Sequence, residues 1–130
     1  MELRSKKVYF RYSIAVVWTS MIVAACMVSA SLVQIPGVDT MVGFDKLGHF
    51  GLYLIAAVLW MNALYLHLPY GYAQMSTLFG LIAVGVIVEF MQAGLTTDRH
   101  FEYYDILANV VGCSAGVIVH PQLLRKGLFS

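Results

Sequence analysis

The sequence predicts an all-α, polytopic membrane protein: a bundle of four transmembrane helices with both termini in the cytoplasm. Hydrophobic residues make up 60% of the 130 residues and charged residues only 12%, whereas soluble domains have roughly 45–50% and about 25%. Four apolar stretches also approach the length of about 20 residues that a spanning helix needs. Finally, six of the eight lysine and arginine residues lie near the two ends of the chain.

The four apolar segments are predicted to form helices over approximately 13–33, 47–68, 74–93 and 104–120, within one domain covering residues 1–130. They are continuously apolar and do not alternate with a period of two residues, which favours helices over the strands of a barrel. The fourth segment is short, so it should thin the bilayer locally or begin before Tyr104. Pro121 is expected to end the fourth helix.

The orientation follows from the lysine and arginine residues that flank these segments. Four lie in the N-terminal tail and two in the C-terminal tail, whereas the loops on the other side contain only Lys46 and Arg99. Positively charged flanks stay in the cytoplasm, so we expect an N-in/C-in topology with residues 34–46 and 95–103 outside. The net charge of +1 and the lack of an aromatic–basic stripe argue against nucleic acid as a partner.

Polar residues that hydrocarbon penalises occur at the outer ends of the second, third and fourth segments. They form pairs three or four residues apart, which share a helix face: Asp45 and His49, Glu89 and Gln92, Asp105 and Asn109. Glu89 follows a long apolar run, and a carboxylate at that depth is costly unless it is paired, protonated or hydrated. We therefore expect all six, together with Arg99, to line one outward-facing pocket. The available partners of Glu89 are Arg99, Lys46 and His49.

The face that carries Asp105 and Asn109 continues inward with Gly112 and Gly116. The two glycines are four residues apart and form a small-xxx-small patch. Such a patch lets a neighbouring helix approach closely. We expect another helix of the bundle to pack here.

Three motif blocks, in order, resemble the signature of the VanZ-like membrane proteins: Asp45-Lys46-x-x-His49, then Glu89-x-x-Gln92, then Arg99 followed by Asp105-x-x-x-Asn109-x-x-Gly112. The resemblance covers roughly residues 44–116. It implies a single VanZ-like domain in the bacterial cytoplasmic (inner) membrane, within the cell envelope. The founding member of that family is associated with reduced susceptibility to the glycopeptide teicoplanin. The resemblance names a family and supplies no reaction.

Binding of an anionic lipid-linked headgroup is the first function that the outer residues suggest. Arg99 offers a planar fork for a phosphate and Lys46 a point charge. Gln92, Asp105 and Asn109 would then hydrogen-bond hydroxyl groups of a sugar or glycerol. Wall precursors on an isoprenoid phosphate and phospholipids both fit the expected side and depth.

Two other classes of function remain open. An enzyme acting on such a headgroup would use Asp45 and His49 as a general base with its orienting group, and Glu89 as a second acid/base group. No motif specifies a cofactor, although oxygen ligands with one imidazole suit Mg²⁺, Mn²⁺ or Ca²⁺. The ligands of such a site would be Asp45, His49, Glu89 and Asp105. Alternatively the chain is a structural or accessory subunit that offers helix faces to a membrane-protein partner, and the polar network only holds the helices together.

Overall fold

The computed structural model describes residues 2–27, 42–95 and 100–129 of the chain. They form four helices and no strand: α1 (Glu2–Cys26), α2 (Val42–Leu64), α3 (Tyr70–Leu95) and α4 (Tyr103–Arg125). Each helix is long and apolar enough to cross a membrane. The predicted all-α fold with four apolar helices is therefore confirmed. Four such helices indicate a multi-pass membrane protein.

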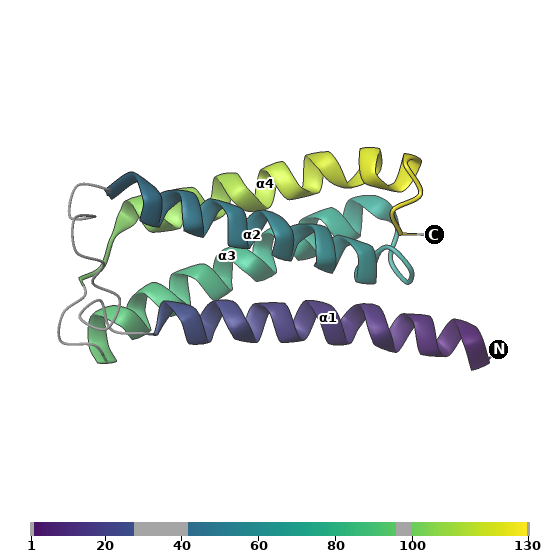
Figure 1. Cartoon of the computed structure of the whole chain (residues 1–130), viewed down its shortest axis with the longest axis horizontal. Helices are drawn as coiled ribbons and strands as arrows, with labels where there is room; N and C mark the ends of the chain where they lie inside the picture. The colour runs from purple at the N-terminus through teal and green to yellow at the C-terminus, as the bar shows by residue number, and fades with distance from the viewer. Residues whose placement is uncertain (1, 28–41, 96–99, 130) are drawn as a thin grey trace.

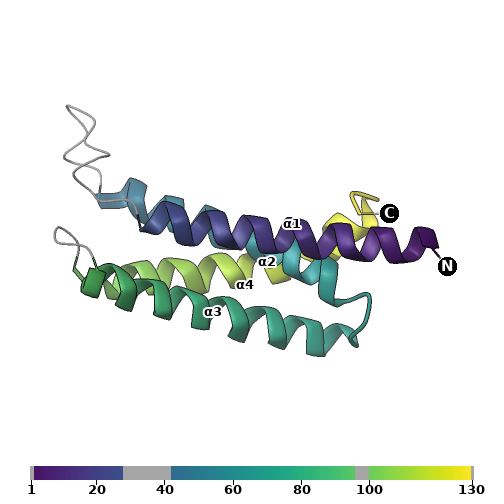
Figure 2. The ribbon, with the colours of Figure 1, turned by 90° about the horizontal axis from the view of Figure 1, so that it is seen from below.

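The helices run up and down along the long axis of the molecule (Figure 1). One end, here called the terminus end, contains the start of α1, the end of α2, the start of α3 and the end of α4. The opposite end, the loop end, contains the other four helix ends. Both chain termini lie at the terminus end, as Figures 1 and 2 show. α2 and α4 form the most extensive helix pair, α1 packs mainly on α2, and α3 packs on both α4 and α2.

Two glycines set the close contact between α2 and α4. A Cβ atom at Gly112 would collide with the carbonyl oxygen of Phe50, and one at Gly116 would lie 2.5 Å from the carbonyl oxygen of Leu54. No side chain larger than hydrogen fits between the two backbones at these points. The predicted small-xxx-small patch is thus where α4 meets α2, and it fixes the relative position of the helix ends that carry the polar residues.

Hydrogen bonds attach α1 to the other helices. The indole N–H of Trp18 donates to the carbonyl of Leu52 at 3.0 Å, and that of Trp60 donates to the hydroxyl of Thr19 at 2.9 Å. In a bilayer, where lipid tails are as apolar as side chains, such bonds contribute to helix association that burial alone does not drive. Both bonds join α1 to α2, in agreement with the packing of these two helices.

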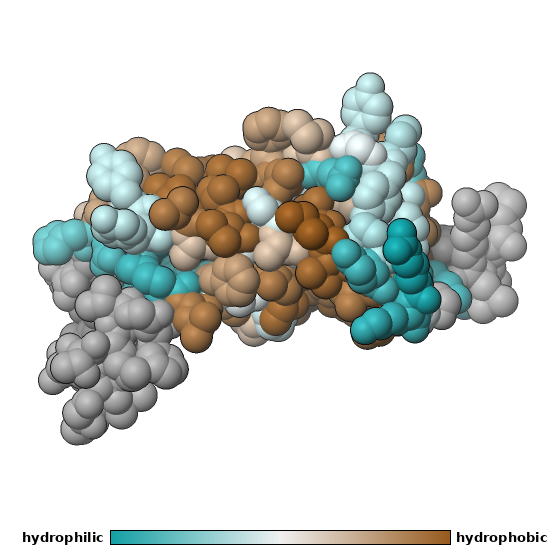
Figure 3. Space-filling view, turned by 90° about the horizontal axis from the view of Figure 1, so that it is seen from above, coloured by the Kyte–Doolittle hydropathy of each residue, from teal (hydrophilic) through white to brown (hydrophobic). Residues whose placement is uncertain are grey.

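Large hydrophobic side chains cover much of the lipid-facing surface. Figure 3 shows that hydrophobic residues cover the middle of the face in view, with hydrophilic residues toward both ends. Phe79, Phe90 and Ile118 are each 64–66% exposed. Exposed apolar surface on this scale is unusual for a soluble monomer and is what a bilayer core requires.

The predicted end of the fourth helix was wrong, because α4 continues through Pro121 to Arg125. Proline removes one N–H bond to the preceding turn and its ring crowds a carbonyl there, and membrane helices tolerate this where neighbours compensate. The helix ends at Arg125. Gly127, two residues later, has a left-handed φ of 73°, a conformation that favours glycine after a helix end. With 23 residues, α4 is about 34 Å long, so the bilayer does not need to thin around it.

Most of the other helix boundaries lie outside the predicted ones, and the end of α2 lies inside. α1 begins at Glu2, so the N-terminal basic residues belong to the helix; residues 28–33 of the predicted first segment lie outside the described part of the chain. α2 begins at Val42 and ends at Leu64, four residues short of its predicted end. Asp45 and Lys46 consequently lie in the first turns of α2, next to the start of α4.

Candidate functional site

The polar residues gather where α2 and α4 begin, at the loop end. Asp45 lies in the first turn of α2 and Asp105 in the first turn of α4. His49 and Asn109 follow them by one turn each, on the faces that the two helices turn toward one another. The close packing of α2 on α4 at the glycines below brings these four side chains together.

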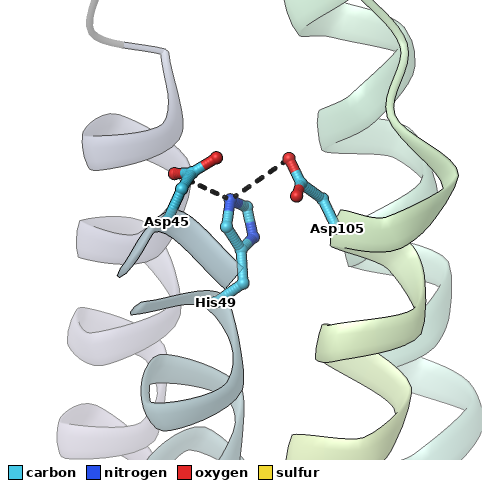
Figure 4. A group of neighbouring side chains, drawn as sticks. All are labelled: Asp45, His49 and Asp105. Atoms are coloured by element: carbon cyan, nitrogen blue, oxygen red, sulfur yellow. Dashed lines mark ion pairs between the residues drawn. The ribbon is translucent and has the colours of Figure 1, made fainter. Parts of the chain in front are cut away.

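His49 is 5% exposed and lies between both helices (Figure 4). Its Nδ1 is 3.1 Å from the amide oxygen of Asn109, and since that oxygen only accepts, Nδ1 donates. Its Nε2 faces two carboxylates, at 3.9 Å from Asp45 and 3.6 Å from Asp105. Asn109 therefore orients the imidazole, and a positive charge at Nε2, either a proton or a bound cation, would suit the two carboxylates.

Lys46 carries the positive charge of the cluster. Its ammonium group contacts the carboxylate of Asp105, lies 2.5 Å from that of Glu102 and 3.4 Å from that of Asp45. The Asp105 side chain is 3% exposed, while those of Asp45 and Glu102 are 44% and 49% exposed. Lys46 thus has one buried partner and two partners at the surface, and the described part of the cluster contains more acidic than basic groups.

Glu89 reaches this cluster from α3 and is 1% exposed. One carboxylate oxygen accepts a hydrogen bond from the backbone N–H of Glu102 at 3.2 Å. The other oxygen is buried and has no hydrogen-bond partner among the described residues. Arg99, the predicted cationic partner, lies outside the described residues, so the Glu89–Arg99 pairing stays a prediction.

A glycine on α3 allows this helix to pack closely against the site. A Cβ at Gly85, one turn before Glu89, would lie 2.9 Å from the amide nitrogen of Asn109 and 3.4 Å from the hydroxyl of Tyr53. The α3 backbone therefore lies directly against Asn109, which orients His49.

The structure brings together most of the residues that the sequence singled out. Direct contacts join Asp45, Lys46, His49, Asp105 and Asn109. Glu89 joins them through the backbone of Glu102 and the contact of that residue with Lys46. Gln92 is 2% exposed, but its amide donates to the carbonyl of Cys26 at 2.6 Å. It therefore ties α3 to the end of α1.

Three members of the site were missed in the sequence: Glu102, Tyr53 and Gly85. A signal existed for each of them. Tyr53 extends the four-residue spacing of Asp45 and His49, Gly85 precedes Glu89 by four residues, and Glu102 precedes Asp105 by three. Tyrosine and glycine are common in apolar helices, so only the three-dimensional packing separates these residues from ordinary ones.

A groove of about 640 Å³ opens beside the polar cluster on the outer face of α2 and α4. Its walls are mostly apolar, and its lining residues are Lys46, Leu47, Phe50, Glu102, Tyr104, Leu107, Ala108 and Val111. Leu47, Leu107 and Val111 are 50–61% exposed, so the groove faces the surrounding lipid. Lys46 and Glu102 belong to both the cluster and the groove.

Three side chains of the cluster have the character of a metal site. Ligand atoms of Asp45, His49 and Asp105 all lie within 4.8 Å of one another. Two carboxylates and one imidazole suit Mn²⁺ or Mg²⁺. However, the ammonium group of Lys46 already contacts both carboxylates, so a cation here would compete with it.

No protein-family model, curated protein or solved structure matches this chain. The resemblance to the VanZ-like proteins therefore stays a prediction from the three motif blocks. The contacts above stand independently of it.

Proposed function

We propose that this chain is a VanZ-like protein of the bacterial cytoplasmic membrane that binds a phosphorylated lipid at the loop end. The polar cluster would hold the headgroup, and the α2/α4 groove would hold the upper part of the hydrocarbon chain. The observation that carries this proposal is the position of Lys46, whose ammonium group lies at the junction of the two. A lipid presents its phosphate at such a boundary between polar and apolar surroundings.

The start of α4 adds a second favourable feature for the phosphate. The N-cap residue Glu102 makes no side-chain hydrogen bond to the first turn of this helix, and helix N-termini favour anions. Tyr104 in this turn lines the same groove as Lys46. A phosphate between them would receive hydrogen bonds from both the ammonium group and the backbone.

The excess of carboxylates narrows the class of headgroup. Carboxylates accept hydrogen bonds and cannot donate them when ionised, so Asp45 and Glu102 would repel a bare phosphate. Both are about half exposed and can turn toward donor groups on a ligand. The cluster therefore suits a phosphate that also carries hydroxyl or ammonium donors, as in a lipid-linked sugar phosphate or a phosphoethanolamine lipid.

The side of the membrane follows from the distribution of positive residues. With both termini in the cytoplasm, as the basic residues at the terminus end favour, the headgroup site opens to the outer leaflet. Lipid-linked envelope precursors and phospholipids are both present there. The N-in/C-in orientation is part of the proposal.

Native mass spectrometry of the detergent-purified full chain tests the proposal. A sugar linked through phosphate to a polyprenol, phosphatidylethanolamine, phosphatidic acid and phosphatidylcholine would be titrated separately. Loss of one charge-assisted hydrogen bond in Lys46→Gln should weaken the preferred lipid roughly ten- to hundredfold. Lys126→Gln removes the same charge at the opposite end and serves as the matched control.

The groove is tested separately by Val111→Trp. Val111 is 50% exposed, so a larger side chain fills the groove without entering the core. This variant should weaken long-chain lipids and leave a short-chain analogue with the same headgroup unaffected. Equal binding of all four lipids by the wild type, or equal effects of Lys46→Gln and Lys126→Gln, would refute the proposal.

A metal-assisted or acid/base enzyme acting on the same headgroup is the second candidate. It is favoured by the position of His49 Nε2 between two carboxylates, which suits either a general base or a cation ligand. Because Lys46 competes for that position, Lys46→Met should increase Mn²⁺ binding, measured by electron paramagnetic resonance. Mass spectrometry would follow turnover of the bound lipid with and without Mn²⁺. A product that the wild type forms and His49→Gln does not form would favour the enzyme. The absence of any product would favour binding alone.

A further inference from the structure

The terminus end holds a second polar site, unrelated to the headgroup site at the loop end. A groove of about 350 Å³ opens here between the start of α1, the end of α2 and the segment after α4. It is lined by Lys7, Phe10, Arg11, Ile14, Leu59, Asn62, Leu128 and Phe129. Two cationic side chains thus lie beside an apolar cleft.

Arg11 is the central residue of this groove. Its guanidinium donates to the carbonyl of Asn62 at 3.3 Å, the hydroxyl of Tyr65 at 3.2 Å and the carbonyl of Phe129 at 2.5 Å. All three acceptors are neutral, and none of the described carboxylates contacts the guanidinium. Of its five N–H donors, two have no partner among the described residues.

Among the side chains that the structure describes, those of acidic residues lie away from this groove. Lys7 has no ion pair with any described residue, and Arg125 and Lys126 follow at the same end of the bundle. The acidic residues whose side chains are described, Asp45, Glu89, Glu102 and Asp105, all lie at the loop end or next to it. A partly buried guanidinium that no described carboxylate pairs with favours an anion from the surroundings, and here the surroundings are the lipid headgroups.

Asn62 gives the groove a second polar feature. It is 6% exposed, and its amide oxygen has no hydrogen-bond partner among the described residues. The last side-chain torsion of asparagine is soft, so the amide can turn toward a donor in the groove. A hydroxyl group on the ligand would supply the missing hydrogen bond.

We propose that this groove binds one anionic phospholipid from the leaflet at the terminus end. The phosphate would lie between Lys7 and Arg11, a glycerol hydroxyl of the headgroup would donate to Asn62, and an acyl chain would pack on Phe10, Ile14 and Leu59. A planar guanidinium with two remaining donors binds phosphate well. A free phosphate ion would use the same cations but would leave the apolar walls without a partner.

The experiment is a native mass spectrometry titration of the full chain with phosphatidylglycerol, phosphatidic acid and phosphatidylcholine. The wild type should retain one phosphatidylglycerol and no phosphatidylcholine. Lys7→Gln should weaken phosphatidylglycerol about fivefold and Arg11→Gln more, whereas Lys126→Gln, a charge outside the groove, should change it less than about twofold. Lys7 is exposed, so its variant keeps the test valid if Arg11→Gln does not fold.

Two further arms separate the parts of the proposal. Asn62→Leu should abolish the preference for phosphatidylglycerol over phosphatidic acid and leave phosphatidic acid binding unchanged; an unchanged preference would refute the hydroxyl contact. Inorganic phosphate at millimolar concentration should not displace the lipid, and full displacement would refute a lipid site. Equal effects of Lys7→Gln and Lys126→Gln would refute the groove and indicate general attraction to charge.

Discussion

Lys46 offers a quantitative test of the polar cluster, because one ammonium group has three carboxylate partners of different burial. Its partner Asp105 has a side chain that is 3% exposed, and its partner Glu102 one that is 49% exposed. Breaking a buried ion pair costs about 3–5 kcal/mol because one charge stays buried and uncompensated, whereas an exposed pair contributes about 0–1 kcal/mol. The ammonium group of Lys46 should therefore stabilise the fold through its pair with Asp105 and hardly through its pair with Glu102.

Replacing Lys46 by Met keeps most of the side-chain volume and leaves Asp105 buried without a cation. We expect the free energy of unfolding to fall by about 3–5 kcal/mol. Glu102→Gln should cost about 0–1 kcal/mol. In the double variant Lys46→Met/Asp105→Asn neither member of the pair leaves an uncompensated charge, and most of the lost stability should return.

Unfolding by sodium dodecyl sulfate in mixed micelles, followed by tryptophan fluorescence, measures these differences. Trp18 and Trp60 both form hydrogen bonds between α1 and α2, so their emission reports on the packed bundle. Additive losses in the double variant would refute a direct Lys46–Asp105 pair. A cost for Glu102→Gln equal to that of Lys46→Met would show that burial does not decide the strength of these contacts.

Three further predictions concern helix packing and topology. Gly112→Ala should destabilise the bundle by about 1–3 kcal/mol through overpacking, whereas Gly51→Ala, where a Cβ would meet nothing within 4 Å, should not; equal effects would refute the backbone contact of α4 with α2. Gln92→Leu should cost about 1–3 kcal/mol because a carbonyl of α1 loses its donor, whereas Gln74→Leu on the same helix should cost little, as detergent unfolding would show. A cysteine at His100 should react with an impermeant thiol reagent from outside the cell only, and reaction from the cytoplasmic side alone would invert the topology.

Spacing along the sequence predicted the meeting of α2 and α4 for a geometric reason. Residues four apart lie on one helix face, so Asp45 with His49, and Asp105 with Asn109, each formed a short polar stripe. Gly112 continued the second stripe and marked the face on which another helix could pack. Two polar stripes at the same depth in the bilayer are expected to face each other, because lipid tails cannot form hydrogen bonds with either and leaving them exposed to lipid costs free energy.

The direction of Gln92 could not be read in the same way. A residue three positions after Glu89 is displaced around the helix by about 60°. In a four-helix bundle that difference is enough to face another neighbour, and Gln92 contacts α1 while Glu89 contacts the start of α4. Spacing along the sequence shows that two residues lie on the same half of a helix. Which neighbouring helix each of them contacts is seen only in the structure.

The hydrogen-bond partner of His49 also could not be predicted from the sequence. The spacing suggested Asp45, but that carboxylate lies 3.9 Å from Nε2 and its side chain is 44% exposed. The buried Asn109 makes the hydrogen bond instead. Asp45 can turn toward water from its exposed position, whereas the buried Asn109 has to find its partner inside the protein.

The described contacts bear on whether the cluster only stabilises the fold. A structural network normally satisfies its own buried atoms, because each unpaired one costs about 1–3 kcal/mol. Here one oxygen of Glu89 and the hydroxyl of Tyr53 are buried without a partner among the described residues, next to the groups that hold His49. Meanwhile Asp45 and Glu102, which contribute little to stability by their exposure, point to the surface beside the groove. We therefore expect different residues to determine stability and binding. Substitutions of Asp105 and Asn109 should lower the free energy of unfolding, whereas substitutions of Asp45 and Glu102 should change which headgroup binds. A Glu102→Gln variant with normal stability and an altered lipid preference would identify the cluster as a binding site.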